Sequence, residues 1–162
     1  MNEVKIFVEI PKGSRQKYEY NEETKKIELD RTIYGPVVFP FEYGHIEGTL
    51  AEDGDPLDAL IVTDEATFPG CIVNSKIIGM LEMEDEKGID NKVIAVPSEK
   101  INPLYADINS IDDLPLHQKN QIKEFFEIYK RMEPNKWVKA KEFTSKERAV
   151  EEVEKSFENY KK

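Results

Sequence analysis

The sequence has little cysteine and no long apolar segment. A single cysteine, Cys71, among 162 residues excludes an internal disulfide framework and a thiolate zinc cluster. We expect Cys71, which precedes an apolar pair, to be a small buried residue. No apolar run approaches the roughly 20 residues that span a bilayer, and the first residues lack a signal-peptide pattern. We therefore predict a cytoplasmic protein with no membrane partner.

Motifs of several common enzyme classes are missing too. The sequence has neither a P-loop nor a Gly-rich dinucleotide fingerprint, and no Ser or Cys lies in a nucleophile-elbow context. His45 and His117 lack the spacing of metal ligands, so we expect both to be structural or surface residues. These absences exclude the usual nucleotide-binding loops and leave no evident covalent nucleophile.

Basic residues are outnumbered by acidic ones. The chain has 23 Lys and Arg against 33 Asp and Glu, and its net charge is −10. Nucleic acids and anionic membranes attract basic surfaces, so we predict no broad binding to either. The charge still allows a small basic pocket for an anion. The acidic excess fits either a carboxylate-lined metal site or a solvated surface.

Alternating apolar residues predict most of the strands. Three strands are expected at residues 4–10, 17–20 and 26–31. Residues 35–44 contain two prolines and two glycines, which indicates an extended, irregular segment. Buried strands are expected at 59–62, at 71–83 as one or two strands, and at 93–96. On the third strand Arg31 shares the parity of Ile27 and Leu29, the face expected to be covered.

Two amphipathic helices are predicted near the C-terminus. The first follows Pro115, ends before Pro134 and carries an apolar stripe of Ile122, Phe125, Phe126, Tyr129 and Met132. A short extended piece is expected at 137–139. The second helix has an expected capping box at Thr144 and Glu147, and its stripe is Ala149, Val150, Val153, Phe157 and Tyr160. Short strands followed by helices predict an α+β fold with a closed or nearly closed sheet, in one domain of residues 1–162.

The first acidic turn, residues 53–58, places three carboxylates within six residues, in the sequence Asp-Gly-Asp-Pro-Leu-Asp. On a straight strand Asp58 would point away from Asp53 and Asp55, but Gly54 and Pro56 allow the backbone to bend. Carboxylates held this close repel each other, and a hard cation such as Mg²⁺, Mn²⁺ or Ca²⁺ would offset the repulsion. The spacing does not fit an EF-hand. The alternative is a plain polar turn before a buried strand.

The second acidic turn, residues 85–92, contains Asp85, Glu86, Asp90 and Lys92. By itself it is also typical of a solvated hairpin turn. Cations and phenols are scattered elsewhere, and each has a structural explanation of its own: Lys17, Arg31, Tyr43, Tyr129 and Lys130. Together with the carboxylates they match what a metal-bound polyphosphate needs, namely acids for the metals and cations for the phosphate oxygens.

These residues also carry a family resemblance. The stretch from Asp53 to Ala59 resembles the signature of the soluble family I inorganic pyrophosphatases. Eight further blocks occur in that family's order and approximate spacing: Val8-Glu9-Ile10-Pro11, Lys17-Tyr18-Glu19, Asp30-Arg31, Phe41-Glu42-Tyr43-Gly44, Asp85-Glu86-x-Gly88-x-Asp90-x-Lys92, Ala95-Val96-Pro97, Tyr129-Lys130 and Lys136-Trp137-Val138. The resemblance covers essentially the whole chain, and its length is that of bacterial-type members.

The resemblance implies a five-stranded, OB-like closed β-barrel flanked by two main α-helices. It implies Mg²⁺-dependent hydrolysis of pyrophosphate to two phosphates, with Mn²⁺ as a possible substitute and no covalent intermediate. Bacterial relatives are commonly hexamers, so it also implies a homohexamer. The chief metal ligands would be Asp53, Asp58 and Asp90, with Asp58 bridging two metals. Asp85 would hold a further metal that arrives with substrate, and Glu9 would act through water.

The remaining roles also follow from the resemblance. Asp55 would accept a proton from the attacking water. The phosphate-binding side chains would be Lys17, Arg31, Tyr43, Tyr129 and Lys130, and Glu19, Glu86 and Lys92 would line the same cavity. Phe39 departs from the pattern, since many bacterial members carry Tyr there, and Glu42 is given no role.

Two other readings stay open at this point. One is a non-enzymatic OB-type module that binds single-stranded nucleic acid or a small ligand. Such modules combine basic grooves with aromatic side chains, whereas here the aromatics accompany acids. The other is a metal-dependent hydrolase of nucleotide phosphoanhydrides, for which the sequence shows no base pocket.

Overall fold

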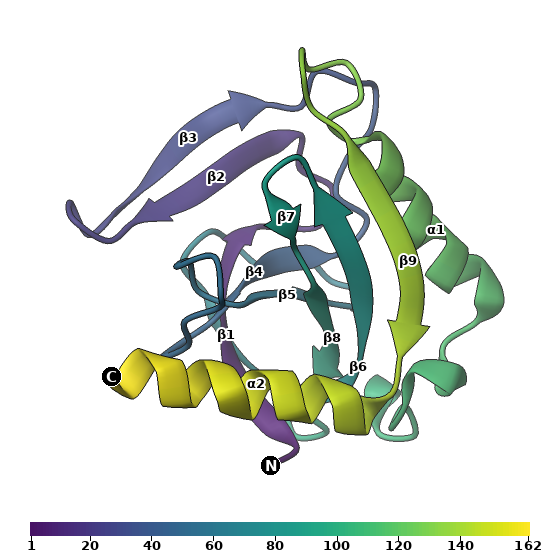
Figure 1. Ribbon diagram of the computed structural model, residues 1–162. Helices are drawn as coiled ribbons and strands as arrows, with labels where there is room; N and C mark the ends of the chain where they lie inside the picture. Colours follow the sequence, from purple (N-terminus) through teal and green to yellow (C-terminus); the bar gives the residue numbers. More distant parts are fainter.

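Five strands close into a barrel in the computed structural model, which describes all 162 residues (Figure 1). Its strands are β1 (Glu3–Ile10), β4 (Glu42–Ile46), β5 (Asp58–Ile61), β8 (Lys92–Pro97) and β6 (Ile72–Asp85). They are hydrogen-bonded in the order β1-β4-β5-β8-β6, and the pairing of β1 with β6 closes the circle. Only the pair β5–β8 is parallel. The predicted α+β fold with a five-stranded closed barrel is confirmed.

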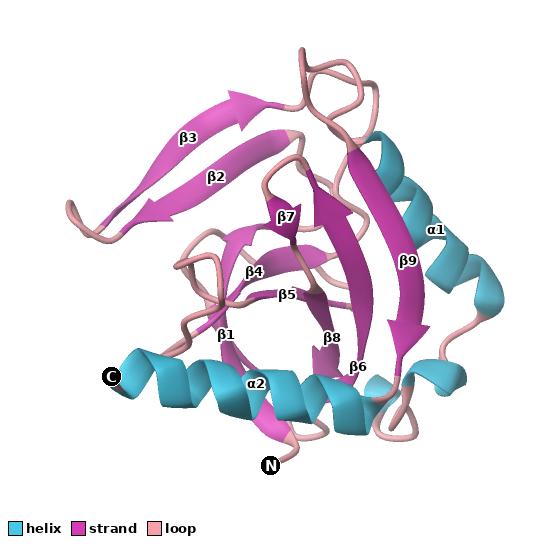
Figure 2. Cartoon of the chain, in the orientation of Figure 1, coloured by secondary structure: helices cyan, strands magenta, loops and turns pink.

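Four more strands lie outside the closed barrel. Strand β9 (Val138–Thr144) and the short β7 (Gly88–Ile89) both pair with β6. Strands β2 (Gln16–Asn21) and β3 (Lys26–Thr32) form a separate two-stranded sheet, which we call the hairpin. Figure 2 shows the hairpin standing apart from the barrel, with its tip projecting away from the molecule.

Two helices pack on the barrel and complete two apolar clusters. Helix α1 (Leu116–Ile128) contributes Phe125 and Phe126 to one cluster, and α2 (Lys146–Lys161) contributes Ala149 and Val153 to the other. Strand β5 contributes side chains to both clusters, because its successive side chains point to opposite faces.

The two 3₁₀ helices are Pro103–Tyr105 and Ile111–Asp113. No helix has both the length and the apolar character needed to cross a bilayer.

Strand β4 is the element that the sequence patterns missed. Residues 35–44 were predicted to be irregular, but β4 begins at Glu42 and pairs with both β1 and β5. Gly44 is there because the strands approach closely, since a Cβ at this position would lie 1.8 Å from the carbonyl oxygen of Phe7. The glycine therefore permits strand pairing here, where the sequence rule took it as a break.

The second acidic turn is more ordered than predicted. Strand β6 is one strand of 14 residues that extends through Glu84 and Asp85, with register shifts between Ile77 and Gly79 and between Leu81 and Met83. Asp85 then pairs with Gly88 of β7, so the turn is a short hairpin. The short extended piece predicted at 137–139 is the start of the longer strand β9.

Several predicted helix details were wrong. Helix α1 begins after Pro115 and ends at Ile128, so Met132 lies beyond it and is 65% exposed. On α2 the N-terminal cap is Ser145, whose hydroxyl accepts the Arg148 N–H, and Tyr160 is 63% exposed. Cys71 is only partly buried. For Met132 and Tyr160, the helical periodicity was extended past the point where tertiary packing covers the chain.

Candidate active site

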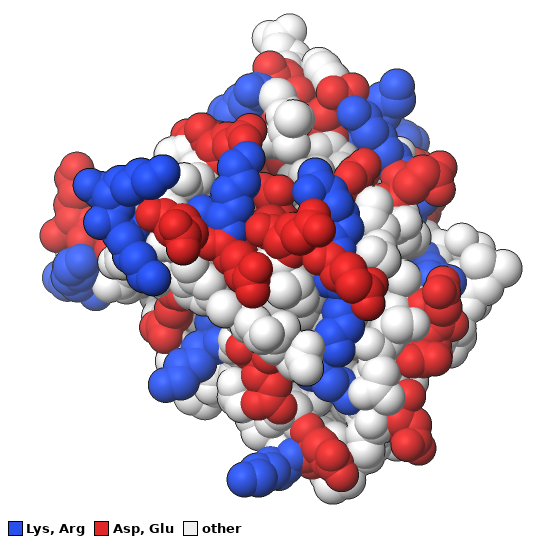
Figure 3. All heavy atoms as spheres, turned by 60° about the horizontal axis from the view of Figure 1, so that its bottom comes forward, with Lys and Arg blue, Asp and Glu red and all other residues white.

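One cavity of about 770 Å³ gathers every site residue that the sequence suggested. These fourteen wall residues come from seven strands and four loops: Glu9, Lys17, Glu19, Arg31, Tyr43, Asp53, Asp55, Asp58, Asp85, Glu86, Asp90, Lys92, Tyr129 and Lys130. In the space-filling view, acidic and basic side chains interleave across the middle of one face (Figure 3). The carboxylates and cations that are far apart in the sequence therefore share one chamber.

The first acidic turn bends as its composition requires. Gly54 has φ +89°, a conformation that L side chains rarely adopt. The Asp55 N–H donates to Asp53 Oδ1 at 3.0 Å, and the Ala51 N–H donates to the Asp55 carbonyl at 2.7 Å. The bend brings Asp53, Asp55 and Asp58, which begins β5, to the same cavity.

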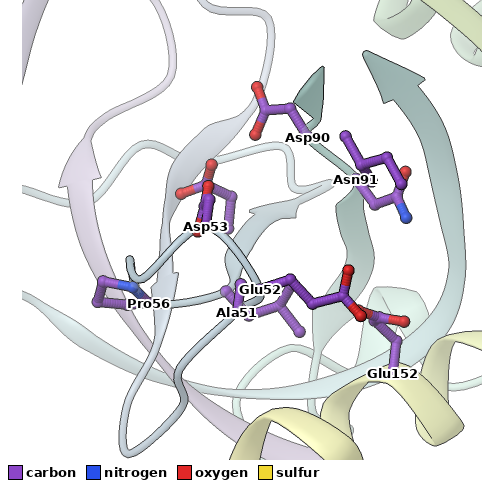
Figure 4. Close-up of a pocket in the computed structure, with 10 residues that line it drawn as sticks. Ala51, Glu52, Asp53, Pro56, Asp90, Asn91 and Glu152 are labelled. Atoms are coloured by element: carbon purple, nitrogen blue, oxygen red, sulfur yellow. The ribbon is translucent and has the colours of Figure 1, made fainter. Parts of the chain in front are cut away.

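Helix α2 supports the residues that lead into this turn. The Leu50 N–H donates to the carbonyl of Ser156 at 2.9 Å, and Asn159 Nδ2 donates to the Leu50 carbonyl at 3.4 Å. Lys155 also pairs with Glu52. A small cavity of about 40 Å³ lies between turn and helix, and in Figure 4 the Glu52 side chain points toward Glu152 and away from Asp53. The turn is therefore supported by the C-terminal helix, far from it in sequence.

Lys92 lies at the centre of the carboxylate cluster and is only 2% exposed. Its Nζ donates to Asp58 Oδ2 at 2.7 Å and to Asp90 Oδ1 at 2.8 Å. Burial lowers the pKa of Lys92, but attraction to Asp58 and Asp90 outweighs it, so the pKa lies well above the ordinary value. The ammonium is therefore a permanent positive charge between two of the proposed metal ligands.

The second acidic turn has a lysine of its own. Lys130 Nζ lies 3.0 Å from Asp85 Oδ2 and 3.2 Å from Glu86 Oε2. Burial raises the pKa of Asp85, but the hydrogen bonds from Lys130 and from the Lys87 N–H outweigh it and lower the pKa below the ordinary value. Asp85 is therefore ionised, and Asp85 and Glu86 share one ammonium that the chain itself supplies.

Two aspartates have the opposite perturbation. Burial, followed by repulsion from Asp53 and Asp58, raises the pKa of Asp55. Burial also raises the pKa of Asp90, with Asp58 adding to the effect and Lys92 opposing it. A carboxylate with a raised pKa is a better proton acceptor, and burial is the main cause at both positions, with neighbouring carboxylates adding to it.

The hairpin supplies two further cations. Lys17 Nζ lies 3.7 Å from Asp30 Oδ2, and Arg31 pairs with the same carboxylate. Arg31 Nε also lies 2.9 Å from Oε1 of the buried Glu133. Arg31 is thus half-buried against Glu133, whereas Leu29, which has the same parity on β3, is 51% exposed, so the face predicted to be covered is covered only in part.

Two phenols complete the wall. Burial raises the pKa of Tyr129, and burial together with Asp58 raises the pKa of Tyr43 well above its usual value, so both stay protonated. Phe39 is buried between them, with ring centroids 5.4 Å from Tyr43 and 6.4 Å from Tyr129. Glu42, which was given no role, is fully buried outside the cavity, where it accepts the N–H groups of Lys12 and Thr67.

Two cavity residues were missed by sequence reasoning. His45, expected to be structural or surface, lines the cavity, and its Nδ1 lies 3.0 Å from Glu9 Oε1. Burial lowers the pKa of His45, but the hydrogen bond to Glu9 outweighs it and raises the pKa. The available signal was its position two residues after Tyr43, on the same strand face. Lys136 also lines the cavity and pairs with Glu133 at 3.0 Å. By contrast, His117 is exposed.

The donor set suits a hard divalent cation. Nine carboxylates and six Lys or Arg side chains line the cavity, an excess of three negative charges. Oxygen donors of this kind are what Mg²⁺ and Mn²⁺ prefer. As the side chains lie, no group of three or more His, Cys, Asp or Glu converges on one point. Instead, the Nζ atoms of Lys92 and Lys130 pair with carboxylate oxygens that a bound cation would also contact.

Comparisons with known proteins agree with this chemistry. The family model for inorganic pyrophosphatase matches residues 6–161. The chain is 51% identical over 160 residues to an inorganic pyrophosphatase of Nanoarchaeum equitans, with 99% of each chain covered. It is 48% identical to that of Aquifex pyrophilus, covering 99% of this chain and 90% of the relative. A solved inorganic pyrophosphatase from Helicobacter pylori superposes with a TM-score of 0.97 at 43% identity, covering 99% and 95% of the two chains.

Proposed function

Because the chain belongs to the inorganic pyrophosphatase family, whose members hydrolyse pyrophosphate, we propose that it does so with Mg²⁺, by attack of water and without a covalent intermediate. Pyrophosphate is a small, highly charged anion with no apolar handle, so its binding must be electrostatic. The observation that carries the proposal is the single cavity whose nine carboxylates face six Lys and Arg side chains. That combination suits an anion that arrives together with metal cations.

The metal-holding residues in this proposal are the aspartates of both acidic turns. Asp53, Asp58 and Asp90 would hold Mg²⁺ in the resting enzyme, with Asp58 shared between two ions, and Asp85 would hold one that comes with substrate. Glu9 would act through water. Bound Mg²⁺ would supply positive charge to the phosphate oxygens and lower the pKa of water from roughly 16 toward neutrality. Mn²⁺ has the same ligand preference and would substitute.

Asp55 is the proposed general base, the one catalytic residue. It lies between Asp53 and Asp58, on the cavity wall, and no lysine or arginine pairs with it. Its raised pKa supports this role, because a base works best when its pKa lies nearer the operating pH. Asp55 would take the proton of the water that attacks phosphorus in line.

The cations and phenols that line the cavity would bind the phosphate oxygens. Lys17 and Arg31 project from the hairpin, and Lys130 follows the end of α1. Tyr43 and Tyr129 keep their hydroxyl protons and so act as hydrogen-bond donors. Together these groups would stabilise the departing phosphate. Glu19, Glu86 and Lys92 would line the cavity without touching the reacting atoms.

The test is phosphate release from pyrophosphate with Mg²⁺, with Mn²⁺ and with a chelator, with ATP run as a competing substrate. We expect turnover that requires the metal and a preference for pyrophosphate over ATP. Equal rates on ATP would favour the hydrolase of nucleotide phosphoanhydrides. Retention of single-stranded DNA at physiological salt without hydrolysis would favour an OB-type binding module.

The assembly and the location stay predictions. A homohexamer rests on the resemblance to bacterial-type members, and measuring the native mass in solution would test it. A cytoplasmic location rests on the sequence, and fractionation of cells would test it.

A further inference from the structure

We propose that His45 is a positioning residue for substrate binding. Together with Glu9 it fastens the hairpin to the barrel and so places the cations that the hairpin carries. The choice of pyrophosphate as substrate rests on the proposed function, but the fastening itself does not.

The hairpin needs such a fastening. Strands β2 and β3 pair only with each other, and neither contains a buried residue. A two-stranded hairpin with no sheet partner is at best marginally stable by itself. Yet it carries Lys17 and Arg31, which face each other across the two strands. The position of both cations therefore depends on how the hairpin is attached.

The carboxylate of Glu9 joins the hairpin to the barrel. Its Oε2 accepts the backbone N–H of Tyr20 on β2 at 2.8 Å, and its Oε1 lies 3.0 Å from His45 Nδ1 on β4. An ionised carboxylate can only accept, so the imidazole donates through Nδ1. Glu9 itself belongs to β1. Three strands thus meet at one carboxylate, and His45 sets its orientation from the barrel side.

Aromatic packing covers this contact. The His45 ring stacks on Phe7, with centroids 5.1 Å apart and an interplanar angle of 18°. The Tyr20 ring lies 5.0 Å from the same Phe7 ring. His45 is 9% exposed, so its hydrogen bond to Glu9 is largely shielded from water. A charge-assisted hydrogen bond in such a place is stronger than one at the surface.

The attachment of the hairpin should affect substrate binding more than the chemical step. Near the open end of the hairpin, Arg31 is tied to Glu133, so loss of the His45 contact would loosen the end near Tyr20. Lys17, which lies three residues before Tyr20 on β2, would then be held less firmly. The same holds for the carboxylate of Asp30, which pairs with Lys17 across the hairpin, and for the part of Arg31 that pairs with that carboxylate. The proposed base, Asp55, lies in the first acidic turn, which α2 supports and the hairpin does not. Weaker substrate binding with little change in turnover is the expected signature.

Two substitutions divide the functions of the imidazole. His45→Phe keeps a ring on Phe7 but removes the Nδ1–H donor, and His45→Asn keeps a donor near Nδ1 but removes the ring. At saturating Mg²⁺ we expect His45→Phe to raise KM for pyrophosphate about tenfold with kcat within about threefold of wild type. His45→Asn should restore most of the loss. His117→Leu, on the exposed face of α1, is the matched control and should change neither.

Amide hydrogen exchange supplies a readout that needs no substrate. In the metal-free full-length protein, His45→Phe should speed exchange of the Tyr20 amide, about tenfold, while amides in β5 stay protected. Loss of kcat at unchanged KM, or equal damage by His45→Asn and His45→Phe, would overturn the proposal, as would unchanged exchange at Tyr20. A wild-type protein that does not hydrolyse pyrophosphate would refute the proposed function alone, because the exchange result still decides the fastening.

Discussion

The two acidic turns carry the same kind of side chain but differ in how their charge is balanced. In the second acidic turn, Asp85 and Glu86 share the ammonium of Lys130. In the first, Asp53 and Asp55 have no lysine or arginine partner, and only Asp58, at its end, reaches Lys92. The pKa is lowered at Asp85, where hydrogen bonds from Lys130 and Lys87 outweigh burial, and raised at Asp55 by burial and repulsion. At the far end of the second turn, burial raises the pKa of Asp90 even though it pairs with Lys92.

The difference indicates an order of events. The first acidic turn is short of positive charge, so a cation binding there relieves repulsion at once. At the second turn a cation must compete with Lys130 for the same oxygens. This agrees with the proposed roles of Asp53, Asp58 and Asp85, in which the first two hold metal at rest and Asp85 receives one with substrate. Asp90 is the exception, because it is a proposed resting ligand of the second turn and already pairs with Lys92.

Asp58→Asn should have the largest effect, because Asp58 is the carboxylate shared between the two proposed resting metals. Losing several kcal/mol of charge stabilisation corresponds to a fall in kcat/KM of roughly three orders of magnitude. Steady-state kinetics and calorimetric Mg²⁺ titration would measure the loss of activity and affinity. Asp112→Asn, at an exposed position outside the cavity, is the control. Normal Mg²⁺ affinity in Asp58→Asn would remove that residue from the metal ligands.

Asp55→Asn should lower turnover next most severely. Removing a general base costs about a hundredfold or more in kcat, and Mg²⁺ affinity should change little because the neighbouring carboxylates remain. The same two measurements apply. Near-normal turnover in this variant would eliminate Asp55 as the base.

Stability of the metal-free protein should respond with opposite signs in the two turns. Asp85→Asn takes one carboxylate from the buried Lys130 and should lower the free energy of unfolding by about 1–3 kcal/mol. Asp55→Asn removes a repelled charge and should raise it by less than about 0.5 kcal/mol, since the side chain is only partly shielded from solvent. Denaturant titrations with a chelator would show both. Destabilisation of similar size by both variants would contradict the contrast between the turns.

The effect of Asp85→Asn should also depend on pH. The pKa of Asp85 is depressed in the folded protein, so its contribution to stability is complete above the ordinary pKa of about 3.9 and is lost as the pH falls through the depressed value. Unfolding curves of wild type and Asp85→Asn should therefore differ at pH 7 and converge in strong acid. A gap that persists there would point to a cause other than the carboxylate charge.

Lys155→Met should have the smallest effect. It removes an exposed ion pair with Glu52, between α2 and the first acidic turn, which is worth no more than about 0.5 kcal/mol. Asn159→Ala removes the shielded contact to the Leu50 carbonyl and is the companion variant. Thermal unfolding and Mg²⁺ titration should show a larger change for Asn159→Ala. A larger effect of Lys155→Met would mean that the surface pair supports the turn.

Much of the fold was predictable where local pattern and tertiary environment agree. Strand β1 alternates apolar and polar residues and is buried accordingly, and β5 and β8 are mostly apolar because they are covered. Strand β4 was not predicted, because Gly44 was interpreted as a break although it marks a close approach to Phe7. Met132 and Tyr160 were predicted to belong to buried apolar stripes but are exposed, because each continues the helical spacing past the surface that covers the helix.

Residue types and their order along the chain were enough to specify the chemistry: oxygen ligands without thiolates, cations beside acids, and a turn that must bend at Gly54 and Pro56. Those properties are local, so they can be read without knowing the fold. The pairing of charges is not local. Which acid meets which lysine, and that His45 meets Glu9 across two strands, depends on barrel closure, because closure brings together residues up to 45 positions apart.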